Sequence, residues 1–129
     1  MQLLDSTTSR SYFEFLQRRL DENERIVLAS ITSKLGKSKG VEKSRIWVEG
    51  PRCTASGFSV GAPFSESWED NKLTFTLDPH GSRNVSGKGT PRIHPVLDTT
   101  GRKVRETFSH THVEVKFFQG VITFEGVTI

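Results

Sequence analysis

Lysine and arginine side chains gather in two short stretches of this sequence. Residues 34–52 hold six of them against two glutamates, and residues 80–105 hold six more against one aspartate. The whole chain has a net charge of only +3, so the remaining sequence is acidic. Clustered cations bind polyanions because they focus the electrostatic potential and release counterions from phosphates. The pattern predicts a phosphate-binding surface, and the alternative is that basic loops only keep the protein soluble.

The cations expected on this surface come from both stretches. They are Lys37, Lys39, Lys43, Arg45, Arg52, Arg83, Lys88, Arg92, Arg102, Lys103 and Arg105. Two segments rich in Gly and Ser, residues 36–40 and 82–89, accompany them and offer backbone N–H groups to phosphates. Neither is a nucleotide-binding P-loop, since residues 81–88 contain one residue too many and Gly89 stands where a hydroxyl should follow the lysine. No cofactor is predicted.

Three histidines, His94, His110 and His112, suggest either metal binding or RNA cleavage. His110 and His112 are two apart, so on a strand they share one face, but a pair is two ligands short of a structural zinc site. General acid–base cleavage of RNA would need two of these histidines, or one of them with Lys116, at a single phosphate. Ordinary exposed strand histidines are the preferred interpretation, so we predict neither a metal site nor catalysis.

Length and composition favour one domain, or two very small units, with a thin core. The chain has 129 residues, of which 33% are hydrophobic, and its single cysteine, Cys53, cannot form an internal disulfide. No stretch reaches the ~18 consecutive apolar residues of a membrane span, and no signal peptide opens the chain. We therefore expect a cytoplasmic protein that does not contact a membrane.

The first 44 residues are expected to form a separate N-terminal part. Apolar side chains between Tyr12 and Leu20 recur at helical spacing, and residues 25–31 are β-branched like a strand. Residues 34–44 are rich in Gly, Ser and Lys, which predicts an exposed, mobile linker. The prediction is a helix and a possible strand over residues 1–33, followed by a basic linker over 34–44.

Beyond the linker, the same order of elements is predicted twice, as a strand, a helical turn and a β-hairpin. The first unit, residues 45–79, has a strand over 45–48, a helical turn or loop over 52–58 and a hairpin of 63–68 with 72–77. A basic loop over 80–92 follows. The second unit, residues 93–129, has a strand over 93–97, a turn over 98–101, a helix over 102–108 and a hairpin of 113–117 with 121–124.

Short matches anchor an internal repeat of about 50 residues. Phe58-Ser59 corresponds to Phe108-Ser109, and the strand residues 73–75 (Leu-Thr-Phe) correspond to 122–124 (Ile-Thr-Phe). One such unit has too little apolar surface to outweigh chain entropy. The two units are therefore expected to share one core.

Large aromatic side chains alternate with polar residues at strand spacing, and most of them are expected to fill that core. They are Trp47, Phe64, Trp68, Phe75, Phe108, Phe117, Phe118 and Phe124. Phe117 and Phe118 are adjacent, so one of the two is expected to point outward, against a nucleobase, the N-terminal helix or a partner chain.

The repeated strand, helical turn and hairpin resemble the swapped-hairpin AbrB superfamily, in which two copies interlock. Residues 44–77 resemble its SymE-type branch in particular, through residues 46–50 (IWVEG), residues 55–58 (ASGF), Gly61 and the strand over 73–77. Residues 93–124 match only in outline. The sequence departs from the family at Cys53, where an apolar residue is common, and over residues 62–66, where the family is more aliphatic.

The resemblance implies a mainly β fold, a swapped-hairpin-like β-barrel made by internal pseudo-duplication. It also implies binding of operator DNA by cationic loops, as in transition-state regulators and antitoxins of the superfamily, or RNA decay and nucleoid binding, as in SymE-like toxins. Arg45 and Arg52 match cationic positions near the DNA-facing surface, and the second unit supplies the residues of the corresponding region, Arg92, Arg102, Lys103 and Arg105.

The leading prediction is therefore a non-enzymatic nucleic-acid-binding regulator, with DNA or RNA as its partner. Two alternatives stay open. One is a protein-binding regulator, such as an antitoxin or a small phage or mobile-element inhibitor of a host defence complex. Its basic loops would meet an acidic or nucleic-acid-binding partner surface, and the N-terminal helix is a second candidate contact for a protein partner. The other is an RNA-cleaving toxin of the SymE kind.

Overall fold

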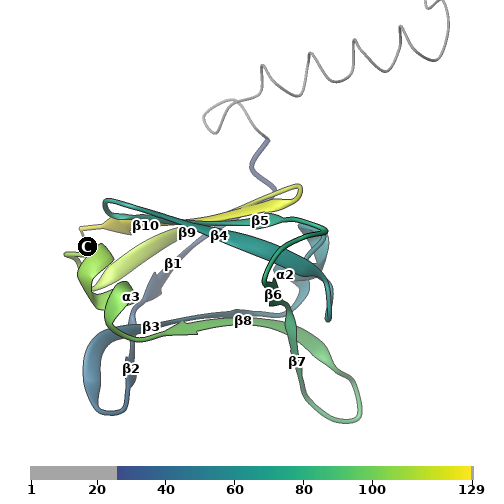
Figure 1. Ribbon diagram of the computed structural model, residues 1–129, viewed down its shortest axis with the longest axis horizontal. Coiled ribbons are helices and arrows are strands. Elements are labelled where there is room, and N and C mark those ends of the chain that lie inside the picture. Colours follow the sequence, from purple (N-terminus) through teal and green to yellow (C-terminus); the bar gives the residue numbers. More distant parts are fainter. Residues whose placement is uncertain (1–25, 129) are drawn as a thin grey trace, which may run out of the picture.

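The computed structural model describes residues 26–128, which form two β-sheets joined by short helices (Figure 1). The predicted N-terminal helix, and the protein contact assigned to it, lie outside the described residues. The elements in chain order are β1 (Ala29–Lys34), β2 (Gly36–Ser38), β3 (Val41–Glu49), α2 (Pro51–Ala55), β4 (Pro63–Glu69), β5 (Lys72–Leu77), β6 (Arg83–Asn84), β7 (Ser86–Lys88), β8 (His94–Thr100), α3 (Arg102–Thr107), β9 (His112–Phe118) and β10 (Val121–Val127). The mainly β fold is confirmed. No helix among these residues is long and apolar enough to cross a membrane.

The sheets lie one above the other. The six-stranded sheet has the order β1-β9-β10-β5-β4-β6, and the four-stranded sheet has the order β2-β3-β8-β7. Helices α2 and α3 lie at opposite ends of the space between the sheets (Figure 1). The expectation of a barrel is wrong in one respect, because no strand between residues 26 and 128 belongs to both sheets and the arrangement is not closed.

Each half of the chain changes sheets at one buried apolar residue. Leu35 separates β1 from β2, and Val85 separates β6 from β7; each is 3% exposed. Their backbone N–H groups donate to the carbonyls of Thr111 and Ala62, at 2.8 and 3.0 Å. These corners interrupt the strand ladders, which is why the two sheets remain separate.

The two halves are related by an approximate twofold arrangement. Equivalent strands pair antiparallel, β3 with β8 and β5 with β10, so that Trp47 lies opposite Asp98 and Thr74 opposite Thr123. The helices also begin alike, because Gly50 and Gly101 precede α2 and α3 with φ of 94° and 117°. A positive φ favours glycine, which explains this residue at both positions.

The hairpin turn of each half is held by the other half. Gly120 N–H donates to the Ser56 carbonyl at the end of α2, at 2.8 Å, and Asn71 N–H donates to the Thr107 carbonyl at the end of α3, at 3.1 Å. The backbone carbonyls of Gly120 and Asn71 also accept hydrogen bonds from the hairpin of the other half. Leu77 N–H on β5 donates to the Gly120 carbonyl at 2.9 Å, and Gly126 N–H on β10 donates to the Asn71 carbonyl at 3.1 Å. Each hairpin is therefore interlocked with the opposite half.

The repeat starts earlier in the chain than its sequence suggests. The predicted mobile linker over 34–44 is wrong. This segment contains β2 and the first four residues of β3, and Ser44 is only 1% exposed. Ser44 Oγ accepts from Ser38 N–H at 2.9 Å, which closes a hairpin whose turn carries Lys39 and Gly40 with positive φ. Gly, Ser and Lys are typical of loops, but here the backbone ladder orders them.

Several other boundaries are confirmed or corrected. Both hairpins and the helix over 102–108 are confirmed, as β4 with β5, β9 with β10, and α3. The turn predicted over 98–101 is wrong, since β8 continues to Thr100, which pairs with Arg45. The basic loop over 80–92 contains the short strands β6 and β7.

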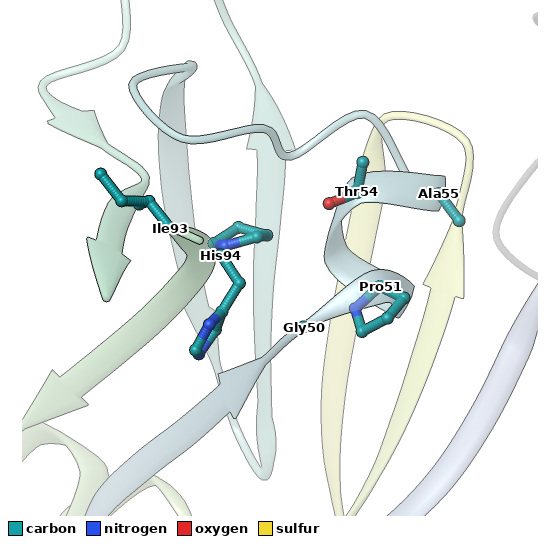
Figure 2. A pocket seen from close by; sticks show the side chains of 7 residues that line it. Gly50, Pro51, Thr54, Ala55, Ile93 and His94 are labelled. Atoms are coloured by element: carbon teal, nitrogen blue, oxygen red, sulfur yellow. The ribbon is translucent and has the colours of Figure 1, made fainter. Parts of the chain in front are cut away.

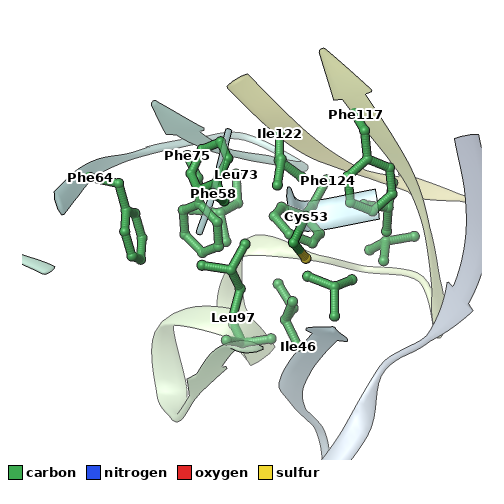
Figure 3. Packing of buried hydrophobic residues seen from close by; sticks show 14 of the residues in the cluster. Ile46, Cys53, Phe58, Phe64, Leu73, Phe75, Leu97, Phe117, Ile122 and Phe124 are labelled. Carbon is green, nitrogen blue, oxygen red and sulfur yellow. The ribbon is translucent and has the colours of Figure 1, made fainter. Parts of the chain in front are cut away.

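The core draws on both halves (Figure 3). A row of rings crosses it, with Phe58 and Phe64 centroids 5.9 Å apart, Phe64 and Phe75 5.0 Å apart, and Phe75 and Phe124 5.2 Å apart. The last contact joins β5 of the first half to β10 of the second. All four rings are fully buried, each at 0% exposure.

Phe117 belongs to the core, whereas its neighbour Phe118 lies on the opposite face of β9 and outside the core cluster. Phe118 is only 4% exposed, so it offers no open face to a nucleobase. Among the described residues, Trp47 and Trp68 are the large aromatic side chains that stay partly accessible. Strand alternation turns Trp47 to the outer face of its sheet, whereas Trp68 lies on the same face of β4 as the buried Phe64 and packs against the core.

We predict that Phe75→Leu and Phe124→Leu each lower the free energy of unfolding by about 1–3 kcal/mol, and that the double variant shows a coupling of about 0.5–1.5 kcal/mol. The reason is the edge contact between these two rings. Urea unfolding followed by circular dichroism and by fluorescence checks this, and the two probes should give one coincident transition.

Phe117→Leu is the matched control, because Phe117 lies on β9, two strands from β5. Its effect should add to that of Phe75→Leu. Two separate transitions, or strict additivity of the Phe75 and Phe124 variants, would contradict a shared core.

Candidate nucleic-acid interface

The outer face of the four-stranded sheet carries one large aromatic side chain, Trp47, in a row of charged residues. On β3, Ile46 and Val48 point into the core and are 3% and 5% exposed, so Arg45, Trp47 and Glu49 point to the opposite face. This alternation positions an indole among ionised groups on a sheet surface that neither helix covers (Figure 1).

Arg45 is fixed beside this indole by a bidentate ion pair. Its Nε donates to Asp98 Oδ1 at 3.0 Å, and its Nη2 donates to Asp98 Oδ2 at 3.1 Å. The hydrogen bond with Asp98 raises the pKa of Arg45. The guanidinium carbon lies 4.6 Å from the Trp47 ring centroid, so the pair also holds a cation against the ring.

Lys88 approaches the same ring from β7. Its Nζ lies 4.9 Å from the Trp47 centroid. Next to it, His94 Nε2 and Glu49 Oε2 are 2.9 Å apart. The hydrogen bond with His94 lowers the pKa of Glu49, with smaller contributions from Trp47 and Lys88. Glu49 therefore stays ionised at neutral pH, and its negative charge lies near Lys88 and Trp47.

Two hairpin ends extend from the four-stranded sheet, away from the six-stranded sheet (Figure 1). The β2–β3 turn carries Lys39, with Lys37 just before it, and the β7–β8 loop carries Arg92. Lys37 pairs with Glu42 at 3.2 Å. Within the part of the chain that the structure describes, Lys39, Lys88 and Arg92 have no carboxylate in ion-pair range.

We call this surface the basic face. It consists of Arg45, Trp47 and Lys88 on the sheet, and of Lys37, Lys39 and Arg92 at the two hairpin ends. All six residues come from segments 36–47 and 88–92, which the antiparallel pairing of β8 with β3 and with β7 brings together.

Two of the predicted phosphate-binding residues are used inside the structure. Arg83 Nη1 donates to Thr99 Oγ1 at 2.7 Å and to Glu66 Oε2 at 3.1 Å, and its Nη2 donates to the Asp98 carbonyl at 2.9 Å. Its guanidinium thus joins the two sheets. Lys43 Nζ donates to the Phe108 carbonyl at 3.2 Å.

The other predicted cations lie on the helices. Arg52 is exposed on α2, and Arg102, Lys103 and Arg105 lie on α3. Lys103 Nζ sits 5.3 Å from the ring centroid of Trp68, on the six-stranded sheet. Arg102 pairs with Glu106 at 3.2 Å. The eleven predicted cations therefore do not form one surface, and the basic face gathers five of them.

A shallow, largely apolar depression adjoins the basic face at α2 (Figure 2). Its volume is about 470 Å³. Pro51, Thr54 and Ala55 line it from α2, and Ile93 and His94 line it from the start of β8. Ile93 is 66% exposed, so the depression has no deep floor.

The histidines do not converge on one site. His94 lies on the four-stranded sheet and His112 on the six-stranded sheet. Lys116 is four positions after His112 on β9, which is about 13 Å along a strand. Among residues 26–128, no three His, Cys, Asp or Glu side chains are grouped to hold a metal ion.

Sequence reasoning missed three residues of this surface: Trp47, Glu49 and Asp98. The alternation of Arg45-Ile46-Trp47-Val48-Glu49 contained the signal for the first two, because it places Trp47 on the same face as two charged residues. Asp98 gave no such signal, since its role depends on pairing with a strand more than 50 residues away.

Comparison of the chain with protein-family models, with curated proteins and with solved structures finds no match.

Cys53 offers a direct check of the packing under this site. It is fully buried in the middle of α2, and burial raises the pKa of its thiol to about 11. About 0.1% of the thiol is then ionised at about pH 8, against about a quarter for a free cysteine. We predict that a thiol-specific disulfide reagent labels the native protein at least about 200-fold more slowly than the denatured protein. Equal labelling rates would contradict the buried placement of Cys53.

Proposed function

We propose that this protein is a non-enzymatic, DNA-binding regulator of the swapped-hairpin AbrB or SymE-like kind, acting in the cytoplasm. The single observation that carries the proposal is the basic face, where Lys88 lies against Trp47, Lys39 and Arg92 extend at the two hairpin ends, and none of these three cations has a carboxylate partner among residues 26–128. Cations without counter-charges gain the most from phosphates, because binding releases counterions and breaks no existing ion pair.

The interlocked hairpins support the structural side of the proposal. The resemblance implies two copies that exchange hairpins, and here Asn71 and Gly120 bond to the opposite halves of one chain. The two hairpin ends then reach beyond the sheet from equivalent places in each half (Figure 1). Such a pair of cationic ends suits contact with two stretches of a phosphate backbone.

The basic face favours binding over cleavage. Its histidine, His94, is hydrogen-bonded to Glu49, and His110, His112 and Lys116 belong to another part of the described chain. General acid–base cleavage needs two proton-transfer groups at one phosphate. The proposed protein therefore holds nucleic acid without cutting it.

We predict that Lys39→Gln with Lys88→Gln weakens binding to a DNA oligonucleotide at least 10-fold at about 50 mM salt. Each lost phosphate contact should also lower the slope of log K against log salt by about 0.9 for duplex DNA. Fluorescence anisotropy between about 50 and 200 mM salt measures both quantities.

The matched control is Lys34→Gln with Lys116→Gln. It removes the same charge from the outer face of the six-stranded sheet, on β1 and β9. This control should change the affinity less than about 3-fold. Equal losses in the two double variants would mean that net charge, and not the basic face, drives binding.

Glu49→Gln should act in the opposite direction. Removing the carboxylate beside Lys88 should tighten DNA binding about 2- to 5-fold at low salt, since a like charge near the phosphates is lost. Glu125→Gln on β10 is the control and should have little effect. Protonation of Glu49 should also tighten DNA binding, because it removes the same negative charge. Since the pKa of Glu49 is lowered, this gain should appear only at a pH below the range in which an ordinary glutamate titrates. An unchanged or weaker affinity of Glu49→Gln argues against phosphate binding next to Lys88.

A further inference from the structure

We propose that the basic face binds single-stranded nucleic acid by stacking an unpaired base on the indole of Trp47. The inference rests on the proposed function and specifies its ligand. It starts from the position of Trp47, an amphipathic side chain that the strand register directs out of the core. Its neighbours along β3, Ile46 and Val48, point inward and are almost fully buried.

The space next to the indole suits a planar group at the surface. Two open depressions border Trp47, one of about 270 Å³ with Arg45 and Lys88, and one of about 240 Å³ over Lys88, Val96 and Asp98. Both are smaller than the roughly 300–1,000 Å³ of small-molecule sites, and both open to solvent. An enclosed metabolite would not be held there, whereas a base that stays attached to its strand would be.

Arg45 is suited to keep the ring in place. Both of its hydrogen bonds go to Asp98, so its guanidinium stays beside Trp47 at 4.6 Å when a ligand arrives. A fixed cation at an aromatic ring orients it and attracts the phosphates on either side of a stacked base.

Lys88 is suited to exchange its partner. It is exposed, and its Nζ lies 4.9 Å from the Trp47 ring centroid, with no ion pair to any residue between 26 and 128. An exposed contact between an ammonium and an aromatic ring is favoured by a factor of about 2 to 5 in its equilibrium constant. Stacking of a base on such a ring is favoured by a factor of about 5 to 140. A base therefore displaces the ammonium from the ring, and the freed ammonium reaches the adjacent phosphate.

The single strand is favoured over the duplex because of where the indole lies. In a duplex the faces of the bases are already stacked on one another, so a ring on a sheet surface meets only phosphate and sugar. In an unpaired strand every base offers a free face. Lys39 and Arg92, on the two hairpin ends, then follow the backbone on either side of Trp47.

The test uses the full-length protein with Trp68→Phe, which leaves Trp47 as the only tryptophan. Titration with unpaired oligodeoxythymidine and oligouridine of about 12 nucleotides should quench its fluorescence at low salt. A duplex of equal charge, and an abasic oligonucleotide with the same number of phosphates, should bind without comparable quenching. The thymidine and uridine arms distinguish DNA from RNA as the source of the unpaired base.

Affinity measurements on variants of Trp47 complete the test. Trp47→Leu should weaken binding of the unpaired strand about 5- to 140-fold and leave binding of the abasic strand within about 3-fold. Trp47→Phe should restore most of the loss, because it keeps an aromatic face. Trp68→Leu is the matched control, since Trp68 lies on the six-stranded sheet.

The outcomes separate this inference from the proposed function. Salt-dependent binding of duplex and single strand alike, with no quenching of Trp47 and no effect of Trp47→Leu, would overturn the stacking and leave a DNA-binding protein. Failure to bind any of these polyanions at about 50 mM salt would overturn both. The quenching arm needs no substitution at Trp47, so it decides the question even if Trp47→Leu fails to fold.

Discussion

The antiparallel pairing of equivalent strands is the constraint on which this structure depends. β3 pairs with β8, β5 pairs with β10, and each hairpin turn bonds to the helix end of the opposite half. Neither half can bury its apolar side chains by itself, since the ring contact of Phe75 with Phe124 and much of the surrounding core cross between them. Ordering the two halves in one chain spares the entropy of bringing two molecules together.

The same pairing creates the surface proposed to bind nucleic acid. Because β3 and β8 are central in the four-stranded sheet, their outward side chains form one continuous face, with the β2–β3 and β7–β8 hairpin ends on either side. Two identical chains around a twofold axis would place the same residue at both equivalent positions. In this single chain, Trp47 faces Asp98 across the ladder, so an aromatic ring and the carboxylate that fixes Arg45 occupy equivalent places.

The cations of this protein serve three different purposes, although they look alike in the sequence. Arg83 joins the two sheets through three hydrogen bonds, and Lys43 binds a helix-end carbonyl. Arg45 holds an aromatic ring, whereas Lys39 and Arg92 have no carboxylate partner among the described residues. A charge that already has two or three protein partners gains little from a phosphate, because it must give up those contacts first. Counting charges along the chain therefore overstates the binding surface.

Local pattern in the sequence determined the hairpins, the helix over 102–108 and the internal repeat, because alternation, turn residues and short apolar runs act over a few neighbouring residues. The strands β2 and β7 could not be predicted, since their Gly, Ser and Lys residues are ordered by backbone bonds to β3 and β8. Only the tertiary structure decided that Arg45 meets Asp98 and that Arg83 is used internally. Each of these depends on which distant strand lies alongside, and strand pairing is fixed by the shared core of the two halves and not by the residues next to each position.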